Sequence, residues 1–358
     1  MLFKAHMGSS GEHASLACWM SLLQPDKQRL WTGGKNPMKD FRSCQRFWDF
    51  MLDGYILASV AKRCGFTTVA EFVSGMGDTD ITTAIETLAN DLVRFSEVAR
   101  ARQKPDEERD REYENHLLLL QHGLVLRNFV LAMRQGDSGR VLVSLSYFTV
   151  WFQVTKKHNY ASETMHLTAC LKLLWSEQMK EFWMENCLIN PSGKKEGFMA
   201  CDYLGEWVVR EVKRMMHHNL NDVTAKFLYD VIAPQVMLFR EVRKKLAEES
   251  GSPRASMHSS IVSTKHEVEN VTTELFLHSV TDKQPGRRDI HVRESEDLHG
   301  AGLIALGTTR RVAKYIERLA RDNGIVSADW EDEDDGELED GELIDGDESD
   351  DDTWLDIE

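Results

Sequence analysis

The stretch FMACDYLGEWVVREVKRMMHH, residues 198–218, decides the fold class that we predict for the chain. Charged side chains recur there at every fourth position, which aligns them along one face of an α-helix: Asp202, Glu206, Arg210, Arg214 and His218. A second stripe is apolar and would pack inward: Leu204, Val208, Val212 and Met215. The pattern predicts an amphipathic helix whose carboxylates are either functional or members of an ordinary ladder of ion pairs.

Most of the chain outside this stretch has the same helical periodicity. Longer helices are predicted at 38–64, 78–102, 113–134, 159–187 and 298–323, and short ones at 13–24 and 266–278. Residues 140–157 are ambiguous, because their alternating apolar and β-branched side chains also suit a strand. Their length and their helical neighbours favour a buried helix, which we adopt. We therefore predict an all-α (mainly α) protein, an irregular multi-helix bundle.

Charge divides the chain unevenly. The formal net charge is −16, yet residues 329–358 carry 18 acidic side chains and no lysine or arginine, so the remainder is nearly neutral. Such a segment is too charged to fold alone, and we predict a disordered acidic tail at 326–358. The predicted units before it are a helical body at 1–250, a linker with one short helix at 251–297 and a basic helix at 298–325.

The cysteines and the hydropathy indicate the compartment. Six cysteines form no CxxC pair and show no regular spacing, which argues against a zinc site or a disulfide framework and favours reduced thiols. The first residues lack the apolar region of a secretory signal. The most apolar run, 117–133, contains Gln121, His122, Arg127 and Asn128, so we interpret it as a buried helix rather than a membrane span. We expect an intracellular protein without a membrane partner.

No signature of a common enzyme class is present: the P-loop, the dinucleotide-binding, the hydrolase and the zinc-protease patterns are all missing from the sequence. No metal site is predicted. Asp49 and Asp53 lie one helical turn apart. Paired carboxylates are needed for two-metal phosphoryl chemistry, and they are also common on exposed helix faces. A basic cluster could contact the phosphates of a nucleic acid, or could be a solvated helix end: Arg240, Arg243, Lys244 and Lys245.

Three segments in order carry a family resemblance: KHNYASETMHLTACLKLLW, FMACDYLGEWVVREVKR and NLNDVTAKFLYDVIAPQV. Their order resembles that of a large fungal family with metazoan relatives, catalogued only as a domain of unknown function, number six-five-eight-nine. Asn159, Tyr160 and Ala161 match the Asn-Tyr-Ala helix start of that family. Asp202 and Glu206 match the first two positions of its Asp-x-x-x-Glu-His-x-Asn helix. The resemblance covers about 1–325 and corresponds to the C-terminal part of the family's length.

The resemblance implies a transposon-derived protein, similar to RNase-H-like transposases, in which carboxylates bind two metal ions for strand cleavage. On that interpretation Glu206 is the last catalytic carboxylate and Asp202 lies one turn before it, with Mg²⁺ as the cofactor. Trp207 and Val209 stand where the family has His and Asn, and neither can replace their hydrogen bonds. The strands that would supply the other acids should precede Met1.

Three functions remain open at the level of the sequence. The leading one is a non-catalytic interaction module, the remnant of a transposon-derived protein, which needs no cofactor. The second is a fragment of an RNase-H-like transposase or nuclease whose other acids lie upstream. The third is a structural helical protein with no nucleic-acid role. A nucleic acid or a basic protein is the expected type of partner.

Overall fold

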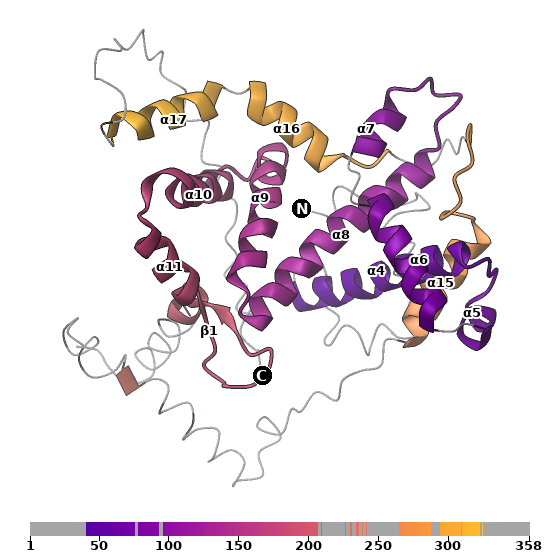
Figure 1. Ribbon diagram of the computed structural model, residues 1–358, viewed down its shortest axis with the longest axis horizontal. Helices are drawn as coiled ribbons and strands as arrows, with labels where there is room; N and C mark the ends of the chain where they lie inside the picture. Colours follow the sequence, from indigo (N-terminus) through magenta and orange to yellow (C-terminus); the bar gives the residue numbers. More distant parts are fainter. Residues whose placement is uncertain are drawn as a thin grey trace, which may run out of the picture.

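The computed structural model describes residues 41–75, 78–92, 96–206, 265–287, 294–308, 310–322 and 324, and single positions between 209 and 241 (Figure 1). These parts are mainly helical, which confirms the predicted fold class. Other predictions fall outside the described residues: the helix at 13–24, most of the helix at 198–218, the basic cluster at 240–245 and the acidic tail.

Helix α8, Arg111–Gln135, runs through the middle of the molecule (Figure 1). Asp110 caps its first turn by accepting a hydrogen bond from the backbone N–H of Tyr113. Gly136 ends it with φ of 75°, a left-handed conformation that glycine adopts without strain. The predicted helix at 113–134 is confirmed to within two residues at its start and one at its end.

By length and composition α8 could cross a membrane, and it is the only helix of the described residues that passes this test. Of its most apolar stretch, 44% is buried inside the protein. Several polar side chains are buried along it: Glu114, His116, Gln121 and His122. Polar side chains can find hydrogen-bond partners inside a protein core, whereas lipid offers none. The burial of these four within the protein therefore favours a core helix over a membrane span.

Helix α4, Phe41–Arg63, packs against both α8 and α15, Lys265–Leu277. The approach to α15 is close at Gly54, where an added Cβ would lie 2.4 Å from Val271 Cγ1. Val271 and Leu275 are essentially inaccessible to solvent. The short helix predicted at 266–278 therefore exists and belongs to the hydrophobic core. The predicted boundaries of the linker around it stay a prediction.

Residues 140–157, ambiguous in the sequence, form helix α9, Ser138–Val154, as we predicted. It packs on α8 and on α16, Leu298–Thr308. Trp151, in the last turn of α9, is fully buried and meets the ring of His122 edge-on, with ring centroids 4.8 Å apart. Because α9 is covered on several sides, its apolar residues do not follow a one-faced helical pattern, and this is the reason for the ambiguity.

The single helix predicted at 159–187 is wrong, because the segment is broken. Helix α10, His158–Ala169, continues into a π-helical turn, Cys170–Leu174. Trp175 then adopts an extended conformation, and the Ser176 side chain caps a new helix by accepting from the Met179 N–H. This helix is α11, Glu177–Asn186. A serine that can cap offers the chain a local alternative to a continuous helix.

A two-stranded antiparallel hairpin follows α11. Its strands are β1, Leu188–Ile189, and β2, Met199–Ala200. The helix predicted from residue 198 therefore starts too early, since the described helical residues begin at 201. The Phe198 N–H donates to the carbonyl of Arg134 at 3.3 Å, so the hairpin is attached to the end of α8.

Shorter helices surround the core. They are α5, Val69–Gly75; α6, Asp78–Leu92; α7, Ser96–Arg102; and α17, Arg310–Asp322. The helix predicted at 78–102 is represented by α6 and α7, with residues 93–95 outside the described part. The helix predicted at 298–323 is likewise represented by α16 and α17, with residue 309 between them not described.

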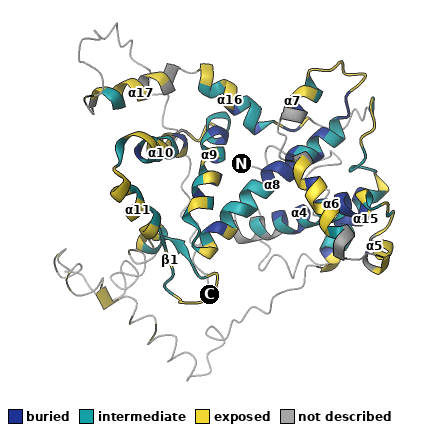
Figure 2. Cartoon of the chain, in the orientation of Figure 1, coloured by how far each residue is buried: buried dark blue, intermediate teal, exposed yellow. Residues whose placement is uncertain are grey.

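Burial differs strongly across the molecule (Figure 2). Buried side chains concentrate along the contacts of α4 with α15 and α8, and of α8 with α9. We call α10, the π turn and α11 the α10–α11 arm; it carries exposed apolar side chains, including Tyr160, Leu173 and Phe182, each more than 60% accessible.

Candidate functional site

The acidic pair predicted from the family resemblance lies on an exposed helical segment, residues 201–206. Asp202 and Glu206 are one turn apart and both side chains are accessible to solvent. Asp202 accepts a hydrogen bond from the neighbouring Tyr203 N–H at 2.7 Å. Within the described residues no group of three or more His, Cys, Asp or Glu side chains is placed to hold a metal ion. Their catalytic role stays a prediction.

The other predicted carboxylate pair has a cation as its partner. Arg127 of α8 donates to Asp53 Oδ1 at 2.5 Å and to the backbone carbonyl of Asp49 at 2.8 Å. Its guanidinium also lies 3.5 Å from Asp49 Oδ1. Burial raises the pKa of Asp49, and Arg127 opposes that change. This arrangement joins α4 to α8 and favours a structural role over metal binding.

A small pocket lies between α4, α6, α8 and the turn that follows α15. Its volume is about 190 Å³, enough for a small polar ligand. We call it the His116 pocket, and it is lined by Ser59, Lys62, Arg63, Leu88, Tyr113, His116, Leu117, Thr281, Asp282 and Lys283. Three of these side chains are cationic and one is acidic. The acidic one, Asp282, pairs with Lys62 at 2.9 Å.

His116 is the buried polar group of this pocket. Its Nε2 atom lies 3.1 Å from Ser59 Oγ, and Ser59 donates its own proton to the Tyr55 carbonyl at 2.7 Å. The imidazole therefore donates from Nε2, which leaves Nδ1 as the unprotonated nitrogen. Among the described residues nothing is placed to bond Nδ1. The Tyr55 ring stacks on the imidazole with centroids 5.3 Å apart.

The electrostatics of the pocket favour a neutral imidazole and an anionic ligand. The pKa of His116 is lowered to about 3, mainly by burial and in addition by the positive charges of Arg63 and Arg287. Of these two cations Arg63 lines the pocket and can attract an anion, whereas Arg287 already pairs with Asp110. The neutral imidazole presents Nδ1 as an acceptor, which suits the hydroxyl of a hydrogen phosphate.

The turn that forms one wall of the pocket is attached to the start of α8. Both carboxylate oxygens of Asp110 are used there: Oδ2 accepts from the Gln284 N–H at 2.5 Å and from Arg287 at 2.9 Å, and Oδ1 accepts from Arg287 at 2.9 Å. Gly286 has φ of 79°, and an added Cβ would lie 2.8 Å from the Glu107 carbonyl oxygen. The geometry fixes Thr281 to Lys283 against α8.

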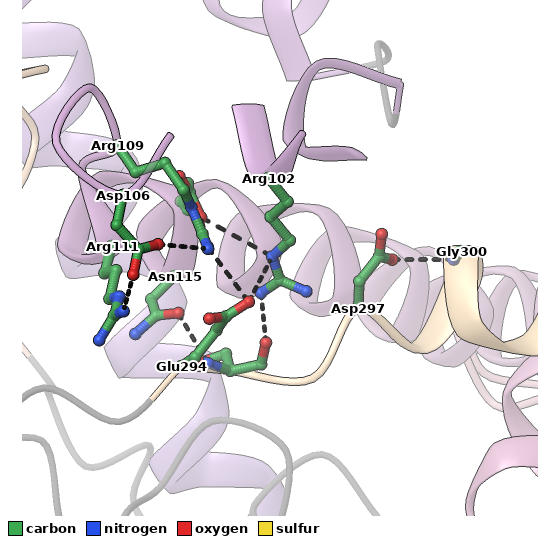
Figure 3. A network of polar contacts seen from close by, with 10 residues as sticks. Arg102, Asp106, Arg109, Arg111, Asn115, Glu294, Asp297 and Gly300 are labelled. Carbon is green, nitrogen blue, oxygen red and sulfur yellow. Dashed lines mark hydrogen bonds and ion pairs between the residues drawn. The ribbon is translucent and has the colours of Figure 1, made fainter. Parts of the chain in front are cut away.

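A second polar network continues from the same place (Figure 3). Arg109 and Glu114 form a buried ion pair at 2.6 Å, and the pair raises the pKa of Arg109. Glu294 contacts Arg109 and Arg102, each at 3.1 Å. The Ser295 N–H donates to the side chain of Asn115 at 2.8 Å. These contacts hold the segment before α16 against α8 and make the region around the pocket rigid.

The arrangement is suited to binding more than to nucleophilic catalysis. Ser59 lies inside α4 and gives its proton to a backbone carbonyl, so its oxygen is not activated by His116. The pKa of His116 is also too low for a general base near neutral pH. The sequence offered no signal for this site, because Ser59 and His116 lie 57 residues apart on two different helices.

The chain folds into a mainly helical protein with a small, polar pocket that is lined by three cationic side chains. The comparisons place it in a family: the sequence model described as "Family of unknown function (DUF6589)" matches residues 1–258, and the chain belongs to this family. The match ends before α15, so it does not extend to about residue 325 as the resemblance suggested. No curated protein and no solved structure matches the chain.

Proposed function

We propose that this chain is a non-catalytic interaction module that binds a phosphate group of its partner in the His116 pocket. The observation that carries the proposal is the combination of a cationic lining with a buried imidazole whose Nδ1 lacks a partner among the described residues. Lysine and arginine recognise phosphate by charge and by donating hydrogen bonds. Hydroxyl groups of Ser59, Tyr113 and Thr281 add polar contacts of the kind that fix the orientation of a ligand.

We also propose that the chain descends from a transposon-encoded protein of fungal origin and acts inside the cell. The order of its motifs supports the descent, and a nucleic acid is then the natural source of the phosphate. A phosphorylated protein or a small phosphate ester would offer the same chemistry. The sources can be distinguished by experiment, since only a nucleic acid adds binding through its bases and its other phosphates.

Binding is measured by isothermal titration calorimetry with inorganic phosphate and with single-stranded DNA, either carrying a 5′-phosphate or lacking it. Loss of one charge-assisted hydrogen bond corresponds to about tenfold in affinity, and we expect Lys283→Gln to weaken phosphate binding by that factor. Lys172→Gln, on the exposed π turn, removes the same charge and should have no effect. If phosphate does not bind at about 10 mM, or binds both variants equally, the pocket is not the site.

The alternative is a fragment of an RNase-H-like nuclease that uses Mg²⁺. The specific observation in its favour is that Asp202 and Glu206 are exposed together on one helical segment. Two-metal cleavage needs several converging acids, and we therefore expect no cleavage of DNA by the purified chain in Mg²⁺ or Mn²⁺. Cleavage that is lost in Glu206→Ala would establish the nuclease instead. A chain that neither binds phosphate nor cleaves DNA would support the purely structural role.

A further inference from the structure

Two cysteines lie opposite each other where the hairpin joins the helices on either side. The strand register pairs Leu188 with Ala200 and Ile189 with Met199, so its continuation pairs Cys187 with Cys201. The Cys201 N–H donates to the Cys187 carbonyl at 2.9 Å, so the two backbones stay adjacent one residue beyond the strands. At this point Cys187 already has helical φ and ψ, −67° and −21°, and Cys201 begins the next helical segment. The two thiols also lie close enough for Cys201 to contribute, after burial, to the raised pKa of Cys187.

The expected spacing suits a covalent bond between the two sulfurs. Opposed residues at a hydrogen-bonded position have Cα atoms about 5.5 Å apart, within the range of about 4.4–6.8 Å found for disulfides. Both residues are free cysteines, with Cys201 exposed and Cys187 partly buried. The thiol of Cys187 faces the last turn of α11, 3.8 Å from the Met184 carbonyl oxygen, and a rotation about its χ1 angle would turn it toward the opposite strand.

We propose that Cys187 and Cys201 form an oxidisable pair, which a peroxide converts to an intramolecular disulfide. The proposal is independent of the phosphate site and of the acidic pair. It is carried by the backbone hydrogen bond between the two residues and by their place directly beside the paired ends of the hairpin. In a reducing compartment such a bond would be transient, as is usual for regulatory disulfides inside cells.

The chemistry has a defined order. Exposed Cys201 reacts first, because burial raises the pKa of Cys187 and so lowers its thiolate fraction. The Cys201 thiolate attacks one oxygen of the peroxide, the O–O bond breaks, and a sulfenic acid and water are formed. Cys187 then attacks the Cys201 sulfur, the S–S bond forms, and the sulfenic oxygen leaves as a second water with the thiol proton. Two thiols are oxidised and one peroxide is reduced.

The bond would join the end of α11 to the beginning of the helical segment at 201–206. That segment carries Asp202 and Glu206, and the hairpin is the stretch of chain that links it to α11. Oxidation therefore fixes the exposed acidic pair relative to the α10–α11 arm. The site is also well placed for exchange with reductants, because the hairpin loop at 192–196 is exposed.

Peptide mapping tests the pair directly. Trypsin cleaves after Lys180, Lys194, Lys195 and Arg210, so Cys187 and Cys201 lie on separate peptides, 181–194 and 196–210. The full chain is treated with hydrogen peroxide, blocked with an alkylating reagent and digested without reductant. We expect these two peptides to appear joined, with a mass about 2 Da below the sum of the free peptides, and to separate on reduction.

Single variants and a matched cysteine complete the test. In Cys187→Ser the linked peptide should disappear and Cys201 should be trapped as a sulfenic acid by dimedone. In Cys64→Ser, which removes another partly buried cysteine, the link should form as in the unmodified chain. The proposal fails if Cys187 and Cys201 remain alkylated as free thiols after peroxide treatment. It also fails if either cysteine is found mainly in a bond to a different cysteine.

Discussion

The region where α8 begins and the α10–α11 arm differ in the kind of side chain that each of them buries. At the start of α8, charged groups are buried and each has a partner: Arg109 with Glu114, and Arg287 with Asp110. In the arm, apolar groups such as Leu173 and Phe182 are exposed. The difference teaches that position in the fold, and not residue type alone, decides burial in this chain.

The two regions should also differ in how much their side chains contribute to the free energy of unfolding. Buried ion pairs cost desolvation energy, and they are favourable only while every member keeps its partner. Exposed apolar side chains contribute little to folding, since they gain little from leaving water. Substitutions near the start of α8 should therefore have large effects and equivalent substitutions in the arm small ones. The predictions below test this ranking from its largest expected effect to its smallest.

Glu114→Ala should have the largest effect. It leaves Arg109 buried without its main partner, and the free energy of unfolding should fall by about 3–5 kcal/mol in chemical denaturation. The matched control is Glu177→Ala, which removes an exposed acid paired with Lys180 in α11 and should change stability by less than about 0.5 kcal/mol. A loss below about 1 kcal/mol for Glu114→Ala would show that the network is not a structural centre.

Leu275→Ala tests whether α15 belongs to the core. Leu275 is 1% accessible, whereas Leu277 on the same helix is 73% accessible. Truncating a buried leucine to alanine costs about 2–5 kcal/mol through lost burial and the cavity it leaves. Leu277→Ala should change the free energy of unfolding by less than about 0.5 kcal/mol. Equal effects of the two variants would place α15 in a linker rather than in the core.

The third prediction concerns pH. The pKa of His116 is about 3 in the folded protein against 6.5 for a free histidine, so only the unfolded chain gains this proton on mild acidification. Above pH 6.5 neither state binds this proton, and the folded protein keeps its full stability. Below pH 6.5 the proton binds to the unfolded chain and stabilises it, so the free energy of unfolding falls as the pH drops toward 3. The loss should be about 2 kcal/mol at pH 5.

The control for the pH effect is His116→Gln, which keeps a polar side chain beside Ser59 and removes the titration. Its stability should fall less steeply between pH 7 and pH 5 than that of the unmodified chain. Sulfate keeps the same charge over this interval, and if it binds in the His116 pocket it should reduce the acid loss in the unmodified chain alone. Parallel pH profiles for the two proteins would show that His116 is not the group that titrates.

Features that depend on neighbouring residues in the sequence were easier to predict than features that depend on contacts made only in the folded protein. The end of α8 was predictable, because Gly136 is a local signal that acts within one turn. Its start was placed two residues late, because the capping residue Asp110 lies within a run of charged residues. The class of α9 could be predicted from its length. The break between α10 and α11 was missed, because Ser176 within an apolar run resembles an ordinary helical serine until its capping bond is seen.

The candidate site was less predictable than the fold. Asp202 and Glu206 could be singled out because they lie one turn apart in a single helix. The His116 pocket could not, since it depends on contacts between α4, α8 and residues 281–283 that have no periodic signal. The opposition of Cys187 and Cys201 depends likewise on a strand register, and no register can be assigned to a hairpin that the sequence did not reveal.

The smallest effect is expected in the arm, where Leu173 and Leu174 are neighbours in the π turn and differ in burial. Leu173 is 68% accessible, so Leu173→Gln removes little buried area and should change the free energy of unfolding by less than about 0.5 kcal/mol. Leu174→Gln has the same chemistry at a partly buried position and should cost clearly more, about 1–2 kcal/mol. Both are compared by thermal and chemical unfolding at low protein concentration, because an exposed apolar surface can also promote association. A large loss for Leu173→Gln that depends on protein concentration would show that another copy of the chain covers the arm. A large loss that does not depend on concentration would show that Leu173 is buried within its own chain, and the contrast between the two regions would then be wrong.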